Sequence, residues 1–123
     1  MNIVTNSTLG CYLNDKIIDI ILTHIKSLEP YFYQLIAISI MPNHIHLLIK
    51  QNLKVVMQQI KGNLAFKINK LLSRKGHFWE MSYFDKAIRD KKLFYIVYKY
   101  IENNARKANL ADKDLRFYGI YNN

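Results

Sequence analysis

His44 and His46 are the residues of this sequence whose types and spacing most clearly allow chemistry. They begin an apolar segment, His44 to Ile49, that has the composition of a β-strand. Successive side chains of a strand alternate between its two faces, so both imidazoles would lie on one face, about 6.5 to 7 Å apart. Imidazoles placed in this way can converge on one divalent ion or on one phosphate group.

The alternative interpretation of this pair is two surface histidines on a strand without any chemistry. Three features of the surrounding sequence favour a site. The pair directly follows a turn-forming segment, Met41-Pro42-Asn43; the chain has only four histidines; and a helix with polar residues follows downstream.

That downstream helix is predicted over 91–107, with Leu93, Ile96, Val97 and Ile101 as its apolar stripe. Tyr100 and Asn104 are four residues apart on it and therefore share one face. A phenol and a carboxamide side by side can act as a nucleophile and as an oxygen ligand. The alternative is a tyrosine at a helix edge and an asparagine near a helix end, and Tyr95 and Tyr98 are close rivals among nine tyrosines.

The other predicted elements form the scaffold of these residues. Strands are predicted over 3–5, 34–40, 44–50 and 77–84, and helices over about 14–28 and 54–74, with turns at 6–10 and 85–90. Because 35–38 and 47–49 are almost continuously apolar, their strands are expected in the middle of the sheet. The segment 111–123 shows no clear element and predicts either a flexible tail or a short docked segment.

Composition limits the class of protein. The 123 residues suit one domain, 1–123, and a net charge of +9 with a pI near 9.7 indicates a polyanionic partner, although a merely solvated basic surface is the alternative. A single cysteine, Cys11, excludes an internal disulfide. Neither a signal peptide nor a membrane-spanning segment is visible, so a cytoplasmic protein without membrane contact is expected.

The helix predicted over 54–74 carries much of the positive charge. No acidic residue occurs between Leu53 and Phe78, and charge of one sign along a helix would be relieved by phosphates. A solvated helix face is the simpler alternative. The candidate DNA-binding residues are Lys54, Lys61, Lys67, Lys70 and Arg74.

The sequence resembles the single-tyrosine HUH transposases, most closely their REP-associated tyrosine transposase branch, over roughly 35–110. Four blocks match the family in order, with Ala105 standing where the family usually has proline. The first block is Ala37 to Ile49, which contains Met41-Pro42-Asn43-His44-Ile45-His46-Leu47-Leu48, and the second is Ile60-Lys61-Gly62 with Ile68-Asn69-Lys70. The third is Phe78-Trp79-Glu80, Tyr83-Phe84-Asp85 and Ile88-Arg89-Asp90, and the fourth is Tyr100 to Ala108.

This resemblance implies an α+β fold of the ferredoxin-like type, with an antiparallel sheet of four or five strands covered by helices. It implies that His44, His46 and Asn104 hold Mg²⁺ or Mn²⁺ and that Tyr100 attacks the scissile phosphate. The products of that attack are a 5′-phosphotyrosine bond and a free 3′-hydroxyl. Single-stranded or hairpin DNA is the implied substrate, and the protein could act as a monomer or as a homodimer.

Three hypotheses therefore remain open on the sequence alone. The first is a metal-dependent transposase that cleaves and rejoins DNA through a tyrosine linkage. The second is a nucleic-acid-binding domain of the same fold that has lost catalysis. The third is a metal hydrolase in which His44 and His46 activate water and Tyr100 plays no part.

Overall fold

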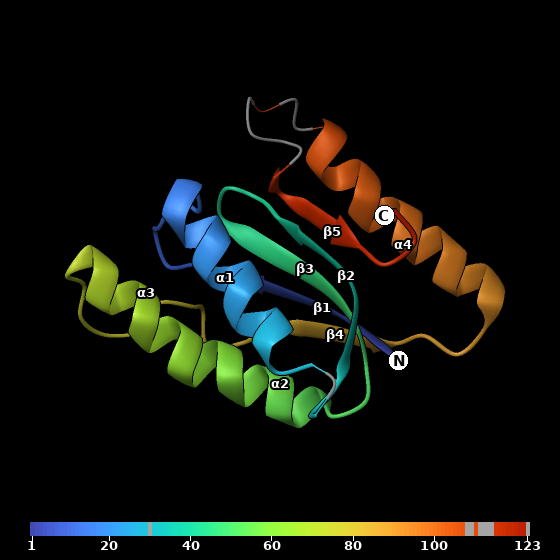
Figure 1. The fold of residues 1–123 in the computed structure, drawn as a ribbon, viewed down its shortest axis with the longest axis horizontal. Coiled ribbons are helices and arrows are strands. Elements are labelled where there is room, and N and C mark those ends of the chain that lie inside the picture. Colours follow the sequence, from blue (N-terminus) through green and yellow to red (C-terminus); the bar gives the residue numbers. More distant parts are fainter. Residues whose placement is uncertain (30, 108–109, 111–114, 123) are drawn as a thin grey trace.

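The structure is a computed structural model that describes residues 1–29, 31–107, 110 and 115–122 (Figure 1). Its centre is a five-stranded antiparallel sheet with the strand order β4-β1-β3-β2-β5. The strands are β1 (Asn2–Ser7), β2 (Gln34–Ile40), β3 (His44–Lys50), β4 (Phe84–Ala87) and β5 (Phe117–Gly119). The helices are α1 (Asp15–Ser27), α2 (Leu53–Gln59), η1 (Ile60–Leu64), α3 (Ala65–Leu72) and α4 (Lys91–Lys107).

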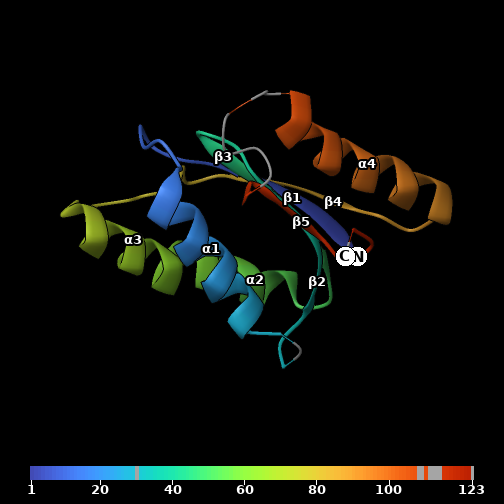
Figure 2. The ribbon, with the colours of Figure 1, turned by 45° about the horizontal axis from the view of Figure 1, so that its top comes forward.

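The helices form two layers, one on each side of the sheet. In Figure 2, α1, α2 and α3 lie together below the sheet and α4 lies alone above it. The buried side chains divide in the same way, into a large cluster that includes Val4, Ile21 and Leu47 and a smaller one that includes Leu48 and Ile101. The predicted α+β sheet with helices packed on it is therefore confirmed.

β3 is the central strand, as its apolar sequence predicted. It pairs with β1 on one side and with β2 on the other, and every residue from Ile45 to Ile49 is buried. Alternation sends Ile45, Leu47 and Ile49 into the large cluster, whereas Leu48 packs towards α4. His46 has the same parity as Leu48 and therefore lies on the α4 side of the sheet.

The predicted helix over 54–74 is interrupted by a single π-helical segment, η1, between α2 and α3. The predicted apolar stripe is buried as far as Ile68, while Leu71 and Leu72 are exposed. In this segment the Ala65 amide donates to the carbonyls of Ile60 and Gly62. The buried Trp79 indole donates a hydrogen bond of 3.1 Å to the Ile60 carbonyl there.

The strand predicted over 77–84 is wrong. Phe78 and Trp79 are buried, but only an isolated bridge between Thr8 and Trp79 joins this segment to the sheet, and β4 starts at Phe84. Aromatic residues favour strands because they suit a half-buried surface, and here the same residues anchor an irregular segment in the core. Residues 85–87, predicted to be part of a turn, continue β4, whose exposed polar side chains suit an edge strand.

One further boundary differs from the prediction. β1 continues through Asn6 and Ser7, where a loop was predicted, because their partners in β3 are Ile45 and His44. Of the two alternatives predicted for the end of the chain, the structure has the docked segment, formed by β5 and the following turn over 115–122; residues 111–114 and 123 lie outside the described part. No helix among the described residues is long and apolar enough to cross a membrane.

Candidate active site

The β2–β3 hairpin holds the two histidines in a fixed position. The Met41 amide donates to the His44 carbonyl at 2.8 Å, which closes the turn. The turn is tied to the rest of the protein as well, since the amides of Thr8 and Leu13 donate to the carbonyls of Asn43 and Pro42 at 2.9 and 2.6 Å. The imidazoles are therefore mounted on a well-bonded hairpin at the centre of the sheet.

The two imidazoles converge more closely than their strand spacing requires. Their Nε2 atoms are 3.1 Å apart, and their ring centroids are 4.7 Å apart with nearly perpendicular planes. Two nitrogens that are each about 2.1 Å from one ion, at about 90° to each other, would be about 3.0 Å apart. The observed separation therefore fits two ligands of a single cation.

The opposite nitrogen of each ring has its own hydrogen-bond partner. Nδ1 of His46 lies 2.8 Å from Thr5 Oγ1, and Nδ1 of His44 lies 2.7 Å from Asn43 Oδ1. The Asn43 oxygen accepts only, so its bond places the His44 proton on Nδ1; the Thr5 hydroxyl can accept in the same way from His46. With both protons on Nδ1, both Nε2 lone pairs are free to bind a cation.

Burial keeps the imidazoles neutral at physiological pH. Desolvation lowers the pKa of His44, and desolvation together with the neighbouring His44 lowers the pKa of His46 to about 4. His46 is 5% exposed, which is the cause of the larger effect. Neutral imidazole is the form that binds a metal ion, so both ligands are ready at pH 7 without losing a proton.

Tyr100 lies directly over this pair. Its ring centroid is 5.6 Å from that of His46, with an interplanar angle of 69°, so the phenol packs edge-on against the buried imidazole. The side chain is 53% exposed and is therefore accessible to a substrate from solvent. α4 thus places the predicted nucleophile next to the predicted metal ligands, on the face of the sheet to which His46 points.

Asn104 lies one turn beyond Tyr100 on α4 and is half-buried. Among the residues that the structure describes, no group of three or more His, Cys, Asp or Glu could hold a metal ion. Asn104, on the same helix as Tyr100, is the residue that the sequence predicted as the third ligand, and its carboxamide is neutral. The ligand set His44, His46 and Asn104 would carry no negative charge.

The predicted DNA-binding residues of the basic helix lie in the other layer. α2 and α3 cover the face of the sheet opposite to α4, so their lysines are not next to Tyr100 (Figure 2). Three of the five also bind protein groups. Lys61 donates to the carbonyls of Glu80 and Met81, Lys67 lies 2.8 Å from His24 Nδ1, and Arg74 donates to the Leu9 carbonyl.

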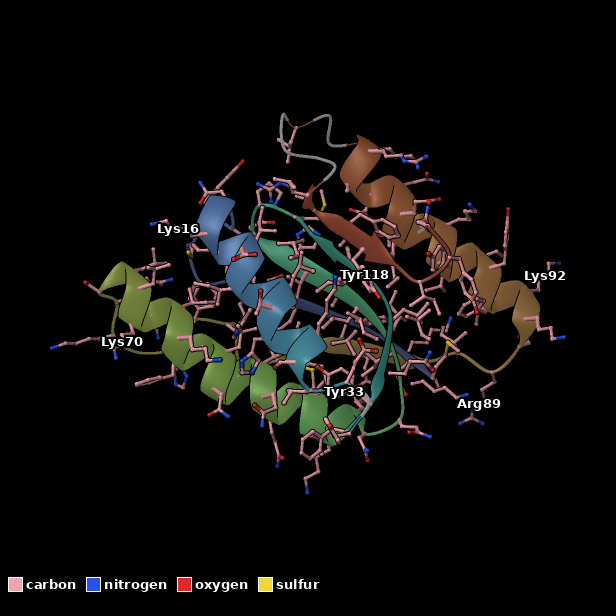
Figure 3. All side chains as sticks on the ribbon, in the orientation of Figure 1. Lys16, Tyr33, Lys70, Arg89, Lys92 and Tyr118 are labelled. Atoms are coloured by element: carbon pink, nitrogen blue, oxygen red, sulfur yellow. The ribbon has the colours of Figure 1, made fainter. Side chains whose placement is uncertain are left out.

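Lys54 and Lys70 are the other two residues of that set and are exposed, and Figure 3 shows Lys70 at the far end of the molecule from α4. The structure therefore brings together His44, His46 and Tyr100, with Asn104 one turn away. It does not bring the basic helix to the same place. A strand of DNA in contact with Tyr100 would meet a different set of charges first.

The sequence interpretation missed Thr5 and Asn43, the partners of the two imidazoles. Asn43 is adjacent to His44 and could have been found from its position in the turn. Thr5 is 41 residues from His46 in the sequence and becomes its neighbour only through the β1–β3 register. Ser39 is the partner of His46 on the other side, in β2, and its buried hydroxyl has no hydrogen-bond partner in the structure.

Comparison with known proteins agrees with this arrangement. The family model described as "Transposase IS200 like" matches residues 11–104, which include His44, His46, Tyr100 and Asn104. No curated protein matches the chain. The match thus covers most of the chain and contains the predicted site residues, whereas Thr5 lies outside it.

Two solved structures share the fold. The REP-associated tyrosine transposase bound to a REP hairpin has a TM-score of 0.69 at 15% identity, and the match covers 87% of this chain and 67% of that one. A putative transposase from Deinococcus radiodurans R1 has a TM-score of 0.59 at 19% identity, covering 83% and 88%. At these identities the two structures are evidence for the fold.

Proposed function

Because the chain belongs to the IS200-like transposase family, we propose that it cleaves and rejoins single-stranded or hairpin DNA through a covalent bond to Tyr100. The observation that carries this proposal is the packing of the exposed Tyr100 ring against His46, at 5.6 Å between centroids. A phenol is a suitable nucleophile for phosphoryl transfer when it is accessible and fixed beside a group that can stabilise charge. Tyr100 is accessible, and the group that would stabilise charge beside it is a cation held by the imidazoles.

The proposed reaction exchanges one phosphodiester bond for another. The Tyr100 oxygen would attack phosphorus, the bond to the 3′-oxygen would break, and a 5′-phosphotyrosine with a free 3′-hydroxyl would result. The phenol proton can pass to solvent because Tyr100 is half exposed, and the departing 3′-oxygen takes up a proton. Attack by another 3′-hydroxyl would reverse the step and join DNA, since the covalent bond preserves the energy of the ester.

We propose that His44, His46 and Asn104 hold a divalent cation, Mg²⁺ or Mn²⁺. The fit rests on the 3.1 Å separation of the two Nε2 atoms and on the neutral state of both imidazoles. When bound, the ion would supply Lewis-acid stabilisation of the charge that builds on the scissile phosphate. Imidazole nitrogen favours Mn²⁺ in such a set, while Mg²⁺ prefers oxygen ligands.

DNA as the partner is supported by two observations. The net charge of +9 favours a polyanion. The structural neighbour with the TM-score of 0.69 is bound to a REP hairpin, and by analogy we propose a hairpin or single strand for this chain. We place the protein in the cytoplasm, where such DNA is accessible in a bacterium, and we propose that it acts as a monomer or a homodimer.

The test is the trapping of a protein–DNA adduct. Labelled single-stranded hairpin oligonucleotides of varied sequence are incubated with protein and Mn²⁺, then separated on a denaturing gel. We expect a protein-linked product that disappears in the Tyr100→Phe variant. Tyr95→Phe is the matched control, because Tyr95 is an exposed tyrosine of the same helix and its variant should retain the adduct.

Other outcomes of this assay correspond to other functions. Cleaved DNA without an adduct would identify a hydrolase in which His44 and His46 activate water. Retarded but uncut DNA for the whole set of oligonucleotides would identify a binding domain without catalysis. An adduct that persists in Tyr100→Phe would assign the nucleophile to another residue.

A further inference from the structure

We propose that an aromatic groove beside the first half of α4 binds an unpaired base of the DNA strand. The groove consists of two adjoining hollows, of about 570 and 240 Å³, that share Phe94, Tyr95 and Tyr121. This inference rests on the proposed function, because it assigns a place to the strand that Tyr100 would cut. It concerns residues outside the candidate active site.

The groove offers the aromatic surface that base stacking requires. Tyr95 and Tyr121 are 63% and 69% exposed, so much of each ring is available. Phe94 and Tyr98 support them from below, with centroid distances from the Tyr121 ring of 6.2 and 5.6 Å. Aromatic side chains of this kind bind bases of any sequence, because every base has a π face.

Tyr121 is held in place by a hydrogen-bond network. Its amide donates to the Tyr98 hydroxyl at 3.1 Å, and that hydroxyl donates to Asn122 Oδ1. The amide group of Asn122 donates to Glu102, a buried carboxylate that also pairs with Lys99 and Arg106. A ring whose position is fixed before binding loses less conformational entropy when a ligand stacks on it.

Glu102 remains ionised in this network. Burial alone would raise its pKa, but hydrogen bonds from Asn122 and Lys99 and the positive charges of Lys99 and Arg106 outweigh it, and the net pKa is lowered. The charge therefore persists at neutral pH and keeps the turn that carries Tyr121 against α4. The exposed ring is part of a built structure and does not belong to a loose end of the chain.

Positive charge surrounds the groove. Arg89 and Lys91 line it, and within the described residues neither side chain makes a hydrogen bond or an ion pair. Lys92 follows Lys91, and Figure 3 shows Arg89 and Lys92 near the start of α4, on the opposite side of the molecule from Lys70. The one acidic residue of the lining, Asp90, accepts a hydrogen bond from the Leu93 amide as a helix cap. Phosphates can therefore bind at the rim.

The groove also lies within reach of Tyr100. Tyr95 and Tyr100 are five residues apart on α4, which is about 7.5 Å along the helix axis and about 140° around it. They therefore lie on opposite flanks of the helix, and both are exposed. A strand bound at the Tyr100 hydroxyl can reach Tyr95 and Tyr121 by crossing the exposed face of α4 between them, which carries Lys92 and Lys99.

A separate hollow outside this groove, of about 410 Å³, lies in the other layer between α3 and the segment 76–81. Phe66 and Met81 line it and are largely exposed, and Lys61 is basic but already bonded to backbone carbonyls. It lies across the sheet from Tyr100, so a base bound there would be far from the cut. A second copy of this chain is a poorer occupant of the α4 groove, because two surfaces with the same positive charge repel each other.

The experiment measures binding of a single-stranded oligonucleotide that contains 2-aminopurine, by fluorescence anisotropy and quenching. All proteins carry Tyr100→Phe, so covalent chemistry does not affect the result. We expect Tyr95→Ala and Tyr121→Leu each to weaken binding about tenfold and to reduce the quenching of the base. Phe66→Ala, an exposed phenylalanine of the other hollow, is the matched control and should bind like its parent.

A pair of charge variants tests the rim. The double variant Arg89→Gln and Lys91→Gln should reduce the salt dependence of single-strand binding, with a change in slope of about 1.4 for two lost contacts. Lys54→Gln with Lys70→Gln removes the same charge from the other layer and should change the slope much less. Melting curves of all variants establish that each protein is folded.

Several results would overturn the inference. The first is an unchanged DNA affinity of both Tyr95→Ala and Tyr121→Leu, and the second is an equal loss of DNA affinity in Phe66→Ala. The third is a parent protein that does not bind the probe. The fourth is that the groove variants change only their molecular mass in light scattering and not their DNA affinity. The last would assign the groove to a second copy of the chain. The proposed function is judged separately, by the adduct formed with native Tyr100, which can form even if the groove variants bind normally.

Discussion

Thr5 Oγ1 lies 2.8 Å from Nδ1 of His46, although the two residues are on different strands and 41 positions apart. The pair forms because Thr5 and His46 are direct partners in the β1–β3 ladder and point to the same face. Through this bond β1 fixes the orientation of an imidazole on β3. The Nε2 atom of His46 is thereby directed towards Nε2 of His44, 3.1 Å away.

Removal of the Thr5 hydroxyl should weaken cation binding without unfolding the protein. Thr5→Val keeps the shape and β-branching, so we expect a loss of about 1 kcal/mol in the free energy of unfolding. Mn²⁺ affinity, measured by calorimetry, should fall about tenfold to a hundredfold. Thr5→Ser, which keeps the hydroxyl, should bind Mn²⁺ nearly as well as the wild type. Equal Mn²⁺ affinity in all three proteins would show that Thr5 does not orient His46.

Cation binding should depend strongly on DNA. The proposed ligands His44, His46 and Asn104 are all neutral, so a phosphate oxygen of the substrate would add negative charge to a set that has none of its own. We expect Mn²⁺ to bind the Tyr100→Phe protein more tightly when a single-stranded oligonucleotide is present. Linkage requires that Mn²⁺ raise the DNA affinity by the same factor. Titrations in both orders measure this factor, and His46→Asn should bring it close to one.

The stability of the metal-free protein should fall in mildly acidic solution. The pKa of His46 is lowered to about 4, so the folded protein binds fewer protons than the unfolded chain, whose histidines titrate near 6.5. The lowered pKa of His46 therefore makes the free energy of unfolding depend on pH. About 3 kcal/mol of it is present above pH 6.5 and is lost as the pH falls from 6.5 towards 4. Urea titrations with a chelator should show this slope, and His46→Asn should make it shallower. A stability that is constant from pH 7 to 4.5 would contradict the lowered pKa.

The fold could be predicted from sequence wherever the local secondary-structure pattern agrees with how the segment packs in the tertiary structure. β2 and α4 have the predicted limits. His44 to Lys50 forms the central strand, because a long apolar segment is stable only where both of its faces are buried. Residues 77–84 show the opposite case. Phe78 and Trp79 satisfy both strand propensity and core burial, and only the tertiary structure decides that burial prevails.

The site divides in the same way. That His44 and His46 share a face follows from strand parity, which local sequence contains, whereas the choice of Tyr100 over Tyr95 and Tyr98 came from the family resemblance. The predicted DNA-binding role of the basic helix required that it lie on the same side of the sheet as Tyr100. Which side a helix covers is set by the topology of the fold and cannot be predicted from the charges of the helix. Lys67 illustrates the difference, because its ammonium binds His24 of α1, a residue that is 6% exposed. Charge counting along the helix cannot reveal such a partner.

Lys67 should therefore affect folding more than DNA binding. Lys67→Met removes the bond to His24 Nδ1 and leaves a buried ring nitrogen without its donor, which should cost about 1 to 2 kcal/mol in the free energy of unfolding. Single-strand affinity at physiological salt should change no more than about twofold. Lys70→Met, an exposed lysine on the same helix, should leave stability nearly unchanged. A marked loss of DNA affinity in Lys67→Met alone would restore this residue to the DNA-binding set.

Gly119 in β5 is the position at which a single methyl group should do most harm. A Cβ atom there would overlap the Tyr98 hydroxyl and the Phe117 ring, and Tyr98 is tied to Asn122 and to the Tyr121 amide. Gly119→Ala should destabilise the protein by about 2 kcal/mol or more, because the buried ring cannot move away without breaking these bonds. Gly62 in η1 has open space around its Cα, so Gly62→Ala should be neutral or stabilising by up to about 1 kcal/mol. Chemical denaturation of the two variants compares them directly, and equal stability would mean that β5 and its turn are not packed against α4 as described.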